Sequence, residues 1–257
     1  IGFPNAGVNP LRGQNNVQGS CDMGALPNSY PGYPSVLDFE AQKKFSELYG
    51  VQMPQDMGLR IPEMFDLAVE GTLKGMFIMG EDPALTDADA NHVRRALENL
   101  EFLAVQNIFM TETAKYADVF LPAALYAEKD GTFTNTERRV QRVRKAIDPP
   151  GDTRADWEII QDLGKRMGIP WHYDSPEEIF EEVRKAVPQY AGMTYERLGT
   201  QGLQWPCPTE DHPGTQYLHK GRFTRGKGLL QGIPYQKAAE LTDEEYPMLL
   251  TTGRMLY

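Results

Sequence analysis

The sequence predicts an α/β protein in which a Rossmann-like parallel sheet is flanked by helices on both faces. Three short apolar runs, at 76–79, 102–105 and 118–122, alternate with stretches of helical period. Continuous apolar strands that alternate with helices are typical of a parallel sheet buried on both sides. Of the 257 residues, 40% are apolar and 24% charged, which allows a sizeable core and argues against disorder.

Helical segments lie between and beyond these runs. After residue 35, Phe39, Phe45 and Leu48 recur at helical spacing, and Gly50 suits the end of that helix. The remaining helices are expected at 62–69 with Pro62 at its first position, at 87–99 with Asp87 as N-cap, at 111–116, at 156–167 with Trp157, Ile160, Leu163 and Met167 inward, and from Ser175 with Pro176 at its first position.

The chain divides into six segments by composition and predicted structure. Residues 1–35 are rich in Gly, Asn and Pro, which predicts irregular backbone. A loop of this length is either a surface linker or a functional loop that wraps a polar ligand. The segments are an active-site and cofactor loop (1–35), a Rossmann-like dinucleotide-binding domain (36–126), a hairpin and loop segment (127–155), a return to the dinucleotide domain (156–176), a helical and loop-rich segment (177–244), and the start of a truncated C-terminal domain (245–257) that opens with a strand at 246–253.

Composition excludes several classes of protein. The net charge of −10 argues against a nucleic-acid surface, which needs a basic face. No stretch approaches the roughly 20 apolar residues of a membrane span, and we find no signal peptide. The two cysteines cannot build a disulfide framework or a four-thiolate metal site. The chain begins at Ile1 rather than Met, which suggests a piece of a longer protein.

Polar groups follow two of the expected strands, where ligands bind in open parallel sheets. Gly80 and Asp82 follow the first run, and Gln106 and Asn107 follow the second. A carboxylate there can accept hydrogen bonds from a guanine edge or from ribose hydroxyls, and an amide can both donate and accept. The sequence therefore predicts a dinucleotide cleft. The alternative is that Asp82 only caps a turn or the next helix.

Other candidate chemistry is sparse. The sequence contains no H-E-x-x-H, G-x-S-x-G or C-x-x-C motif, and no G-x-G-x-x-G or P-loop fingerprint. A basic run spans 138–145 in an otherwise acidic chain. It is either a solvated face or a clamp for a pyrophosphate or a partner.

Three segments resemble a known family. The segments MTETAKYADVFLPA (110–123) and EKDGTFTNTERRVQ (128–141) resemble molybdopterin oxidoreductases. The loop RGQNNVQG (12–19) with CDMG (21–24) is similar to the catalytic (alpha) subunits of formate dehydrogenases. Many relatives carry Gly where this chain has Arg138, so this motif favours the formate dehydrogenase branch.

The resemblance implies a function and a set of site residues. The family holds molybdenum or tungsten between two molybdopterin guanine dinucleotides, oxidises formate to carbon dioxide, and passes electrons to a [4Fe–4S] cluster. Arg12 matches an arginine that orients formate, which suits a guanidinium facing a carboxylate. Gln14 matches an amide that contacts the pterin. One guanine dinucleotide is gripped at Gly80, Asp82, Thr86 and Gln106, with further contact positions at Ala123 and Asp156; Asp156 alternatively serves as an N-cap.

The same resemblance places other parts of the machinery outside this chain. It puts the cluster cysteines and the metal-ligating selenocysteine or cysteine upstream of Ile1, so no metal ligand is expected here. The implied partners are formate and electron-transfer subunits or an acceptor (NAD, ferredoxin or a hydrogenase), and the implied location is cytoplasmic. Two alternatives stay open: another molybdopterin reductase, such as a nitrate-type enzyme, and a non-catalytic homologue such as the large iron–sulfur subunit of respiratory Complex I.

Overall fold

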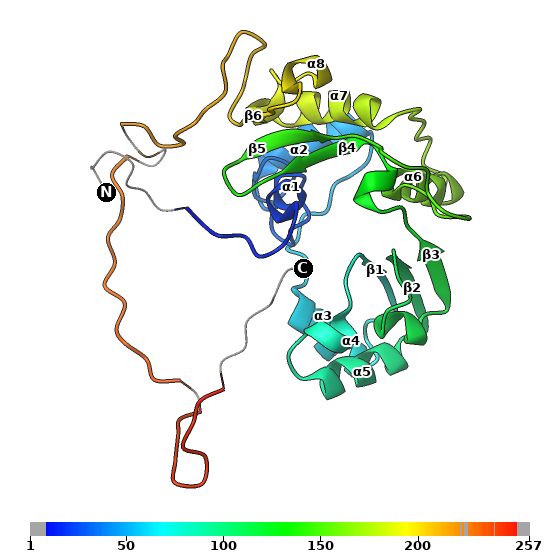
Figure 1. The fold of residues 1–257 in the computed structure, drawn as a ribbon, viewed down its shortest axis with the longest axis vertical. Helices are drawn as coiled ribbons and strands as arrows, with labels where there is room; N and C mark the ends of the chain where they lie inside the picture. The colour runs from blue at the N-terminus through cyan, green and yellow to red at the C-terminus, as the bar shows by residue number, and fades with distance from the viewer. Residues whose placement is uncertain (1–8, 222, 224–225, 239, 251–257) are drawn as a thin grey trace.

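The chain forms two α/β lobes, each built around its own three-stranded sheet (Figure 1). The structure is a computed structural model that describes residues 9–221, 223, 226–238 and 240–250. The helices are α1 (Val17–Asp22), α2 (Phe39–Tyr49), α3 (Ile61–Val69), α4 (Pro83–Thr86), α5 (Ala90–Asn99), α6 (Asp156–Arg166), α7 (Pro176–Ala186) and α8 (Tyr195–Leu198), with 3₁₀ turns η1 (Thr113–Tyr116), η2 (Tyr126–Glu128) and η3 (Pro188–Tyr190). The strands are β1 (Gly75–Met79), β2 (Phe102–Asn107), β3 (Val119–Pro122), β4 (Gly131–Thr134), β5 (Arg139–Val143) and β6 (Leu203–Gln204).

The first sheet is parallel, with strand order β1-β2-β3. Ile78 pairs with Val105, and Val105 pairs with Phe120, so the apolar runs align across the sheet. α5 crosses between β1 and β2, and η1 lies between β2 and β3. The predicted parallel α/β arrangement is therefore confirmed.

Helices α3 and α5 cover one face of this sheet. Alternate strand residues, including Ile78, Leu103 and Val105, pack with Phe65 of α3 and Val93 of α5 in a single buried cluster. Each large apolar side chain buried here contributes about 1.5–3 kcal/mol relative to exposure. Burial of this face thus accounts for the association of the two helices with the strands.

Much of the opposite face of the same sheet is exposed, and the start of α6 covers only its carboxyl end at Gln106, which corrects the prediction of cover on both faces. Phe77 lies level with Val119 through β2, and both are exposed, as are Met79 and Phe102. Side chains alternate between the faces of a strand, so these residues share one side. The continuous apolar runs predicted burial on both sides, but among the described residues only one side has helices over its apolar residues.

The second sheet is antiparallel, with strand order β4-β5-β6. Strands β4 and β5 form the expected hairpin, in which Thr134 pairs with Val140. Val140 is fully buried in a second apolar cluster with Phe45 of α2, Phe180 of α7 and Leu198 of α8. This cluster joins residues 30–45 with residues 180–207 into one lobe.

The expectation of irregular backbone throughout 1–35 is wrong at one place. Residues Val17–Asp22 form the short helix α1. Six residues are too few for an isolated helix to be stable in water, so α1 depends on tertiary contacts. Those contacts join residues far apart in sequence, which explains why local composition did not predict the helix.

Helix ends follow the sequence signals with one exception. Asp38 caps α2, Gly50 ends it with φ +66°, and Ser175 caps α7. Asp87, however, does not cap the helix before residue 99. It follows the extra short helix α4, and the carboxylate of Asp89 caps α5 by accepting from the His92 amide.

Helix α6 buries a different side from the one expected. Ile159 is buried, whereas Leu163 and Met167 are exposed and Met167 lies just past the end of the helix. Near the start of α6, the backbone of Arg154 bridges that of Ala123. This start therefore lies beside the carboxyl end of β3.

The described residues 226–238 and 240–250 lie away from both lobes (Figure 1). Residues 246–250 do not form the strand expected at 246–253, and 251–253 lie outside the described residues. Leu250 is 90% exposed, and these residues pair with no strand in the part of the chain that the structure describes. No described helix is long and apolar enough to cross a bilayer.

Candidate functional site

The carboxyl ends of β1 and β2 are joined by two hydrogen bonds. The Gly80 amide donates to the Gln106 carbonyl over 2.9 Å, and the Asn107 side-chain amide donates to the Glu81 carbonyl over 3.3 Å. Gly80 turns the chain with φ +72°, a conformation that favours glycine. The two polar strand ends predicted to form a cleft therefore lie next to each other.

Asp82 uses its carboxylate inside the fold. Oδ1 accepts from the amide and the hydroxyl of Thr113 over 2.8 and 2.6 Å, and Oδ2 accepts a longer bond of 3.4 Å from the Glu112 amide. These bonds attach η1 to the end of β1. The Thr86 hydroxyl, which is exposed, donates to the Asp82 carbonyl. The Asp82 carboxylate therefore does not cap the next helix, α4, but bonds the turn η1 about 30 residues further on. Its Oδ2 keeps most of its capacity to accept from a ligand.

Gln106 and Asp156 meet although 50 residues separate them in the sequence. Gln106 is 0% exposed, and its Nε2 donates to Asp156 Oδ1 over 2.7 Å. Lys129 forms an ion pair with the other oxygen, Asp156 Oδ2. Ala123 is buried at the adjacent end of β3, where the Ala123–Arg154 bridge brings the start of α6 close.

The carbonyl oxygen of the Gln106 side chain is buried without a hydrogen-bond partner among the described residues. The Gln106 side-chain nitrogen donates to the Asp156 carboxylate. If the side-chain amide were flipped, its carbonyl oxygen would face that carboxylate oxygen without a hydrogen between them, so the orientation is fixed. An unpaired buried acceptor costs about 1–3 kcal/mol. The site therefore offers one acceptor to a ligand that presents an N–H or O–H group.

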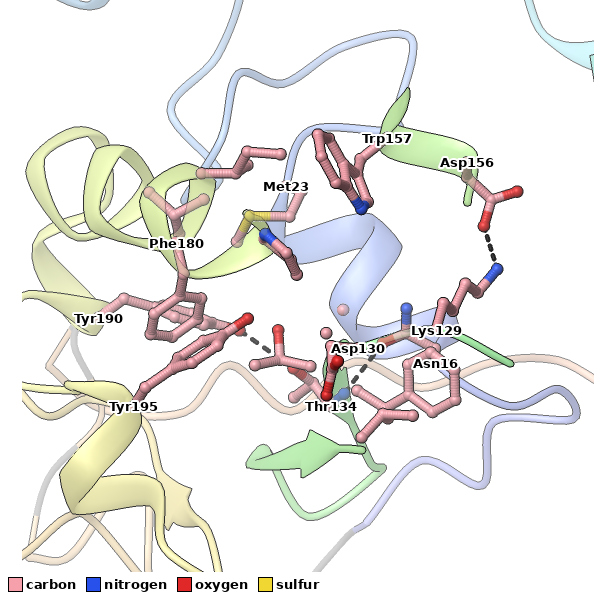
Figure 2. A pocket seen from close by; sticks show the side chains of 18 residues that line it. Asn16, Met23, Lys129, Asp130, Thr134, Asp156, Trp157, Phe180, Tyr190 and Tyr195 are labelled. Carbon is pink, nitrogen blue, oxygen red and sulfur yellow. Dashed lines mark hydrogen bonds and ion pairs between the residues drawn. The ribbon is translucent and has the colours of Figure 1, made fainter. Parts of the chain in front are cut away.

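An open pocket of about 270 Å³ lies beside Asp156, between α1, β4, α6 and α7 (Figure 2). Asn16, Lys129 and Asp156 supply polar groups on one side, and aromatic rings such as Trp157 and Phe180 line much of the rest. Of the predicted site residues, Asp156 alone is among the described residues that line this pocket. Sequence reasoning missed Lys129, although it lies in the quoted motif at 128–141.

Arg12 and Gln14 lie apart from these groups, on the segment that precedes α1. Arg12 is exposed and Gln14 is partly exposed. Arg12 lies close enough to Tyr33 to act on it electrostatically. The pKa of Tyr33 is raised mainly by burial and, to a smaller extent, by its hydrogen bond to Asp22. The positive charge of Arg12 partly opposes this rise. The described residues show no hydrogen bond between Arg12 or Gln14 and the strand-end residues.

Sequence reasoning also missed a buried carboxylate at the end of α1. Asp22 is 1% exposed and accepts from Gln18 Nε2 and the Tyr33 hydroxyl on Oδ1. Its Oδ2 accepts from the Tyr190 hydroxyl over 2.5 Å and from Trp205 Nε1 over 2.8 Å. Burial, with the Asp22 charge and hydrogen bond, raises the pKa of Tyr190 well above its ordinary value. An acid among glycines in a loop gave no local signal of this role.

The basic run at 138–145 is mostly used within the fold. Arg138 donates to the carbonyls of Trp205, Thr215 and Gln216, and Arg144 donates to the Gly199 carbonyl. Two more members form ion pairs, Arg139 with Glu137 and Lys145 with Asp148, while Arg142 lies 3.6 Å over the Tyr195 ring. Most of these cations are therefore structural rather than a free anion clamp.

Comparison with known proteins identifies the family of this fold. Residues 1–166 match the family model described as molybdopterin oxidoreductase. The chain belongs to the molybdopterin oxidoreductase family. The resemblance expected from the motifs at 110–141 is thereby confirmed.

Relatives in this molybdopterin oxidoreductase family carry more specific names. The chain is 55% identical to "F420-dependent formate dehydrogenase 2 subunit alpha" of Methanococcus maripaludis, which matches 100% of this chain and 38% of the relative. It is 47% identical to "Formate dehydrogenase H" of Escherichia coli, over 99% of this chain and 36% of the relative. The chain therefore spans less than two-fifths of these relatives. Among solved structures, acetylene hydratase from Pelobacter acetylenicus matches with a TM-score of 0.46 and 19% identity, over 70% of this chain and 29% of that one.

Proposed function

We propose that this chain is the central part of a formate dehydrogenase catalytic subunit that binds a molybdopterin guanine dinucleotide at the ends of β1 and β2. The names of its relatives support formate as the substrate. The single structural observation that supports ligand binding here is the buried, unpaired carbonyl oxygen of Gln106. A guanine edge carries N–H donors that would satisfy it.

The residues around Gln106 suit such a group. Asp82 Oδ2 and Asp156 add two negatively polarised acceptors, and the exposed Thr86 hydroxyl adds a polar group at the same edge. The ion pair with Lys129 offsets the negative charge of Asp156, and each carboxylate oxygen has room to accept a further hydrogen bond. In this proposal Gly80 lets the backbone pass close to the ligand, and Ala123 borders the same site.

The chain's own residues would bind and orient the substrate. When bound, the molybdopterin cofactor supplies the two-electron redox chemistry. Arg12 offers a planar fork of N–H donors that pairs with both oxygens of formate, which fixes the direction of its C–H bond. Gln14 supplies an amide to the pterin. Arg12 stands on an exposed segment and is free to meet a small anion.

The finer parts of the proposal concern the complete subunit. Two guanine dinucleotides hold molybdenum or tungsten, and electrons pass to a [4Fe–4S] cluster whose ligands lie outside this chain. The acceptor is NAD, ferredoxin or a hydrogenase; F420 joins these candidates because a relative is named F420-dependent. We place the protein in the cytoplasm.

The test is an assay of the complete subunit with formate and, separately, with nitrate, using a viologen dye as the electron carrier. We expect formate-dependent reduction of the dye and no turnover of nitrate. Nitrate turnover would favour a nitrate-type enzyme. Absence of both metal and pterin from the purified subunit would favour a non-catalytic homologue.

Replacing Arg12 with lysine tests the assignment of the substrate group. A lysine keeps the charge but loses the bidentate geometry, so we expect formate turnover at low substrate to fall by about tenfold or more. Metal and pterin content should stay at the parent level, because Arg12 lies apart from Gln106 and Asp156. Unchanged kinetics would remove Arg12 from the proposed site.

A further inference from the structure

The direction of the Arg12–Gln14 segment depends on how helix α1 begins. Neither Arg12 nor Gln14 has a side-chain hydrogen bond in the part of the chain that the structure describes. Four residues after Arg12, Asn16 takes the left-handed conformation, with φ +57° and ψ +15°, and α1 follows at once. Asparagine is among the few residues that adopt this conformation readily. Asn16 therefore sets the angle at which the segment leaves the helix.

The Asn16 side chain forms a hydrogen bond that links this turn to the second sheet. Its Oδ1 accepts from the Thr134 amide at the end of β4 over 2.9 Å (Figure 2). Gly19, one turn along α1, is buried against the same oxygen, and a Cβ at Gly19 would overlap it. The small residue at 19 is therefore required for the Asn16–Thr134 contact.

The bond from Asn16 is the first link of a path that reaches the other end of α1. The Thr134 hydroxyl lies 3.3 Å from the Tyr190 hydroxyl (Figure 2). The Tyr190 hydroxyl in turn donates to Asp22 Oδ2 over 2.5 Å. Asp22 is the last residue of α1. One end of this six-residue helix is thus hydrogen-bonded to β4 and the other to η3, so the helix cannot tilt without breaking these bonds.

We propose that Asn16 is a positioning residue that, through its bond to the Thr134 amide, fixes the Arg12–Gln14 segment toward the substrate and the pterin. This inference rests on the proposed function, because the roles of Arg12 and Gln14 do. Asn16 itself lines the pocket and acts only by placing the residues before it. Its effect on turnover passes through the backbone of the preceding four residues.

The test uses Asn16→Gly in the complete, cofactor-loaded subunit. Glycine adopts the same positive φ, so the turn can persist while the side-chain acceptor is lost. We expect faster amide hydrogen exchange in peptides covering 9–16 and at Thr134. We also expect the KM for formate to rise about tenfold while kcat changes less than about threefold, because a misdirected Arg12 weakens substrate holding more than chemistry.

Three further variants control the experiment. Asn16→Asp keeps an acceptor oxygen and tolerates the turn, so both exchange and KM should return toward the parent values. Gly19→Ala displaces the Asn16 oxygen by another route and should reproduce the rise in KM. Asn91→Ala changes an exposed asparagine on α5, outside this segment, and should behave as the parent.

The outcomes separate this inference from the function on which it rests. Parent-like exchange at Thr134 in Asn16→Gly, or faster exchange with an unchanged KM, would overturn the positioning role. Arg12→Lys is measured alongside. If it is impaired while Asn16→Gly is normal, the proposed function stands and the inference fails. If Arg12→Lys is normal, the role of Arg12 fails and the inference falls with it.

Discussion

Replacing Asp22 with asparagine tests whether its buried carboxylate holds helix α1 to the segment around residues 190–205. The four donors to this carboxylate are Gln18, Tyr33, Tyr190 and Trp205, which come from α1, the following loop, η3 and the segment after β6. Asparagine has nearly the same shape, so the variant changes hydrogen bonding and charge without leaving a cavity. One of its two polar atoms becomes an N–H donor.

The geometry gives a magnitude for the loss. A hydrogen bond to a charged group contributes about 1.5–3 kcal/mol, against about 0.5–1.5 kcal/mol for a neutral pair. The asparagine NH₂ would have to face Gln18 and Tyr33, since the indole N–H of Trp205 can only donate. We expect Asp22→Asn to lower the free energy of unfolding by about 2–4 kcal/mol, and Asp22→Ala by about 3–5 kcal/mol, because alanine leaves all four donors without this acceptor.

Urea unfolding followed by tryptophan fluorescence measures this loss, and Trp205 lies at the site itself. Asp152→Asn is a matched control because Asp152 is exposed, and its unfolding free energy should stay within about 0.5 kcal/mol of the parent. An Asp22→Asn variant that is equally close to the parent would refute the reasoning, since it would mean that the four bonds contribute no more to a charge than to a neutral amide.

Three further predictions follow from contacts described above. Asp82→Ala should lower the molybdenum content of the complete subunit, measured by mass spectrometry, and should also lower stability by about 1–3 kcal/mol because Thr113 loses its acceptor. Arg138 adopts φ +67°, a backbone conformation that is strained for a residue with a side chain. The free energy of unfolding in urea should therefore be about 1 kcal/mol higher for Arg138→Gly than for Arg138→Ala. Burial, only partly opposed by the charge of Arg142, raises the pKa of Tyr195 to about 12. The unfolded chain ionises first, near pH 10, so stability should fall as pH rises from about 10 to 12, seen by tyrosinate absorbance and circular dichroism.

Each of these predictions has an outcome that contradicts it. Normal molybdenum content in Asp82→Ala would leave that residue with the structural role alone. Equal stability of the alanine and glycine variants at position 138 would show that the turn is not strained. Ionisation of Tyr195 near pH 10 in the folded chain, compared with Tyr195→Phe, would show that burial does not shift its pKa.

Sequence features among neighbouring residues predicted the longer helices and the strands of the parallel sheet well, but they did not predict the short helix α1. Pro62 and Ser175–Pro176 mark helix starts, and the apolar runs of β1 to β3 predict their parallel order, because these features depend on near neighbours. Helix α1 depends on Thr134 and Tyr190, more than 100 residues away, so its own six residues carry no sufficient signal. The displaced N-cap at Asp89 reflects two acids only two positions apart, either of which can cap.

The candidate site was predictable in its positions but not in its bonds. Gln106 and Asp82 follow from the rule that ligands bind at the carboxyl ends of parallel strands, and the family resemblance supplied Asp156. The ion pair between Lys129 and Asp156 and the free carbonyl of Gln106 required the three-dimensional arrangement. A carboxylate such as Asp22 has the same sequence signal whether solvated or buried, so its four donors could not be anticipated.

The exposed part of this face of the parallel sheet has a practical consequence for work with the isolated chain. Phe77, Met79, Phe102 and Val119 present a row of apolar side chains to water. Such a patch favours self-association, and sulfate or phosphate salts strengthen that tendency by driving apolar surface out of solution. Light scattering of the isolated chain should therefore rise with protein concentration and with ammonium sulfate. Replacing Phe77 and Phe102 by serine should suppress this rise while leaving the helix-covered side of the sheet unchanged.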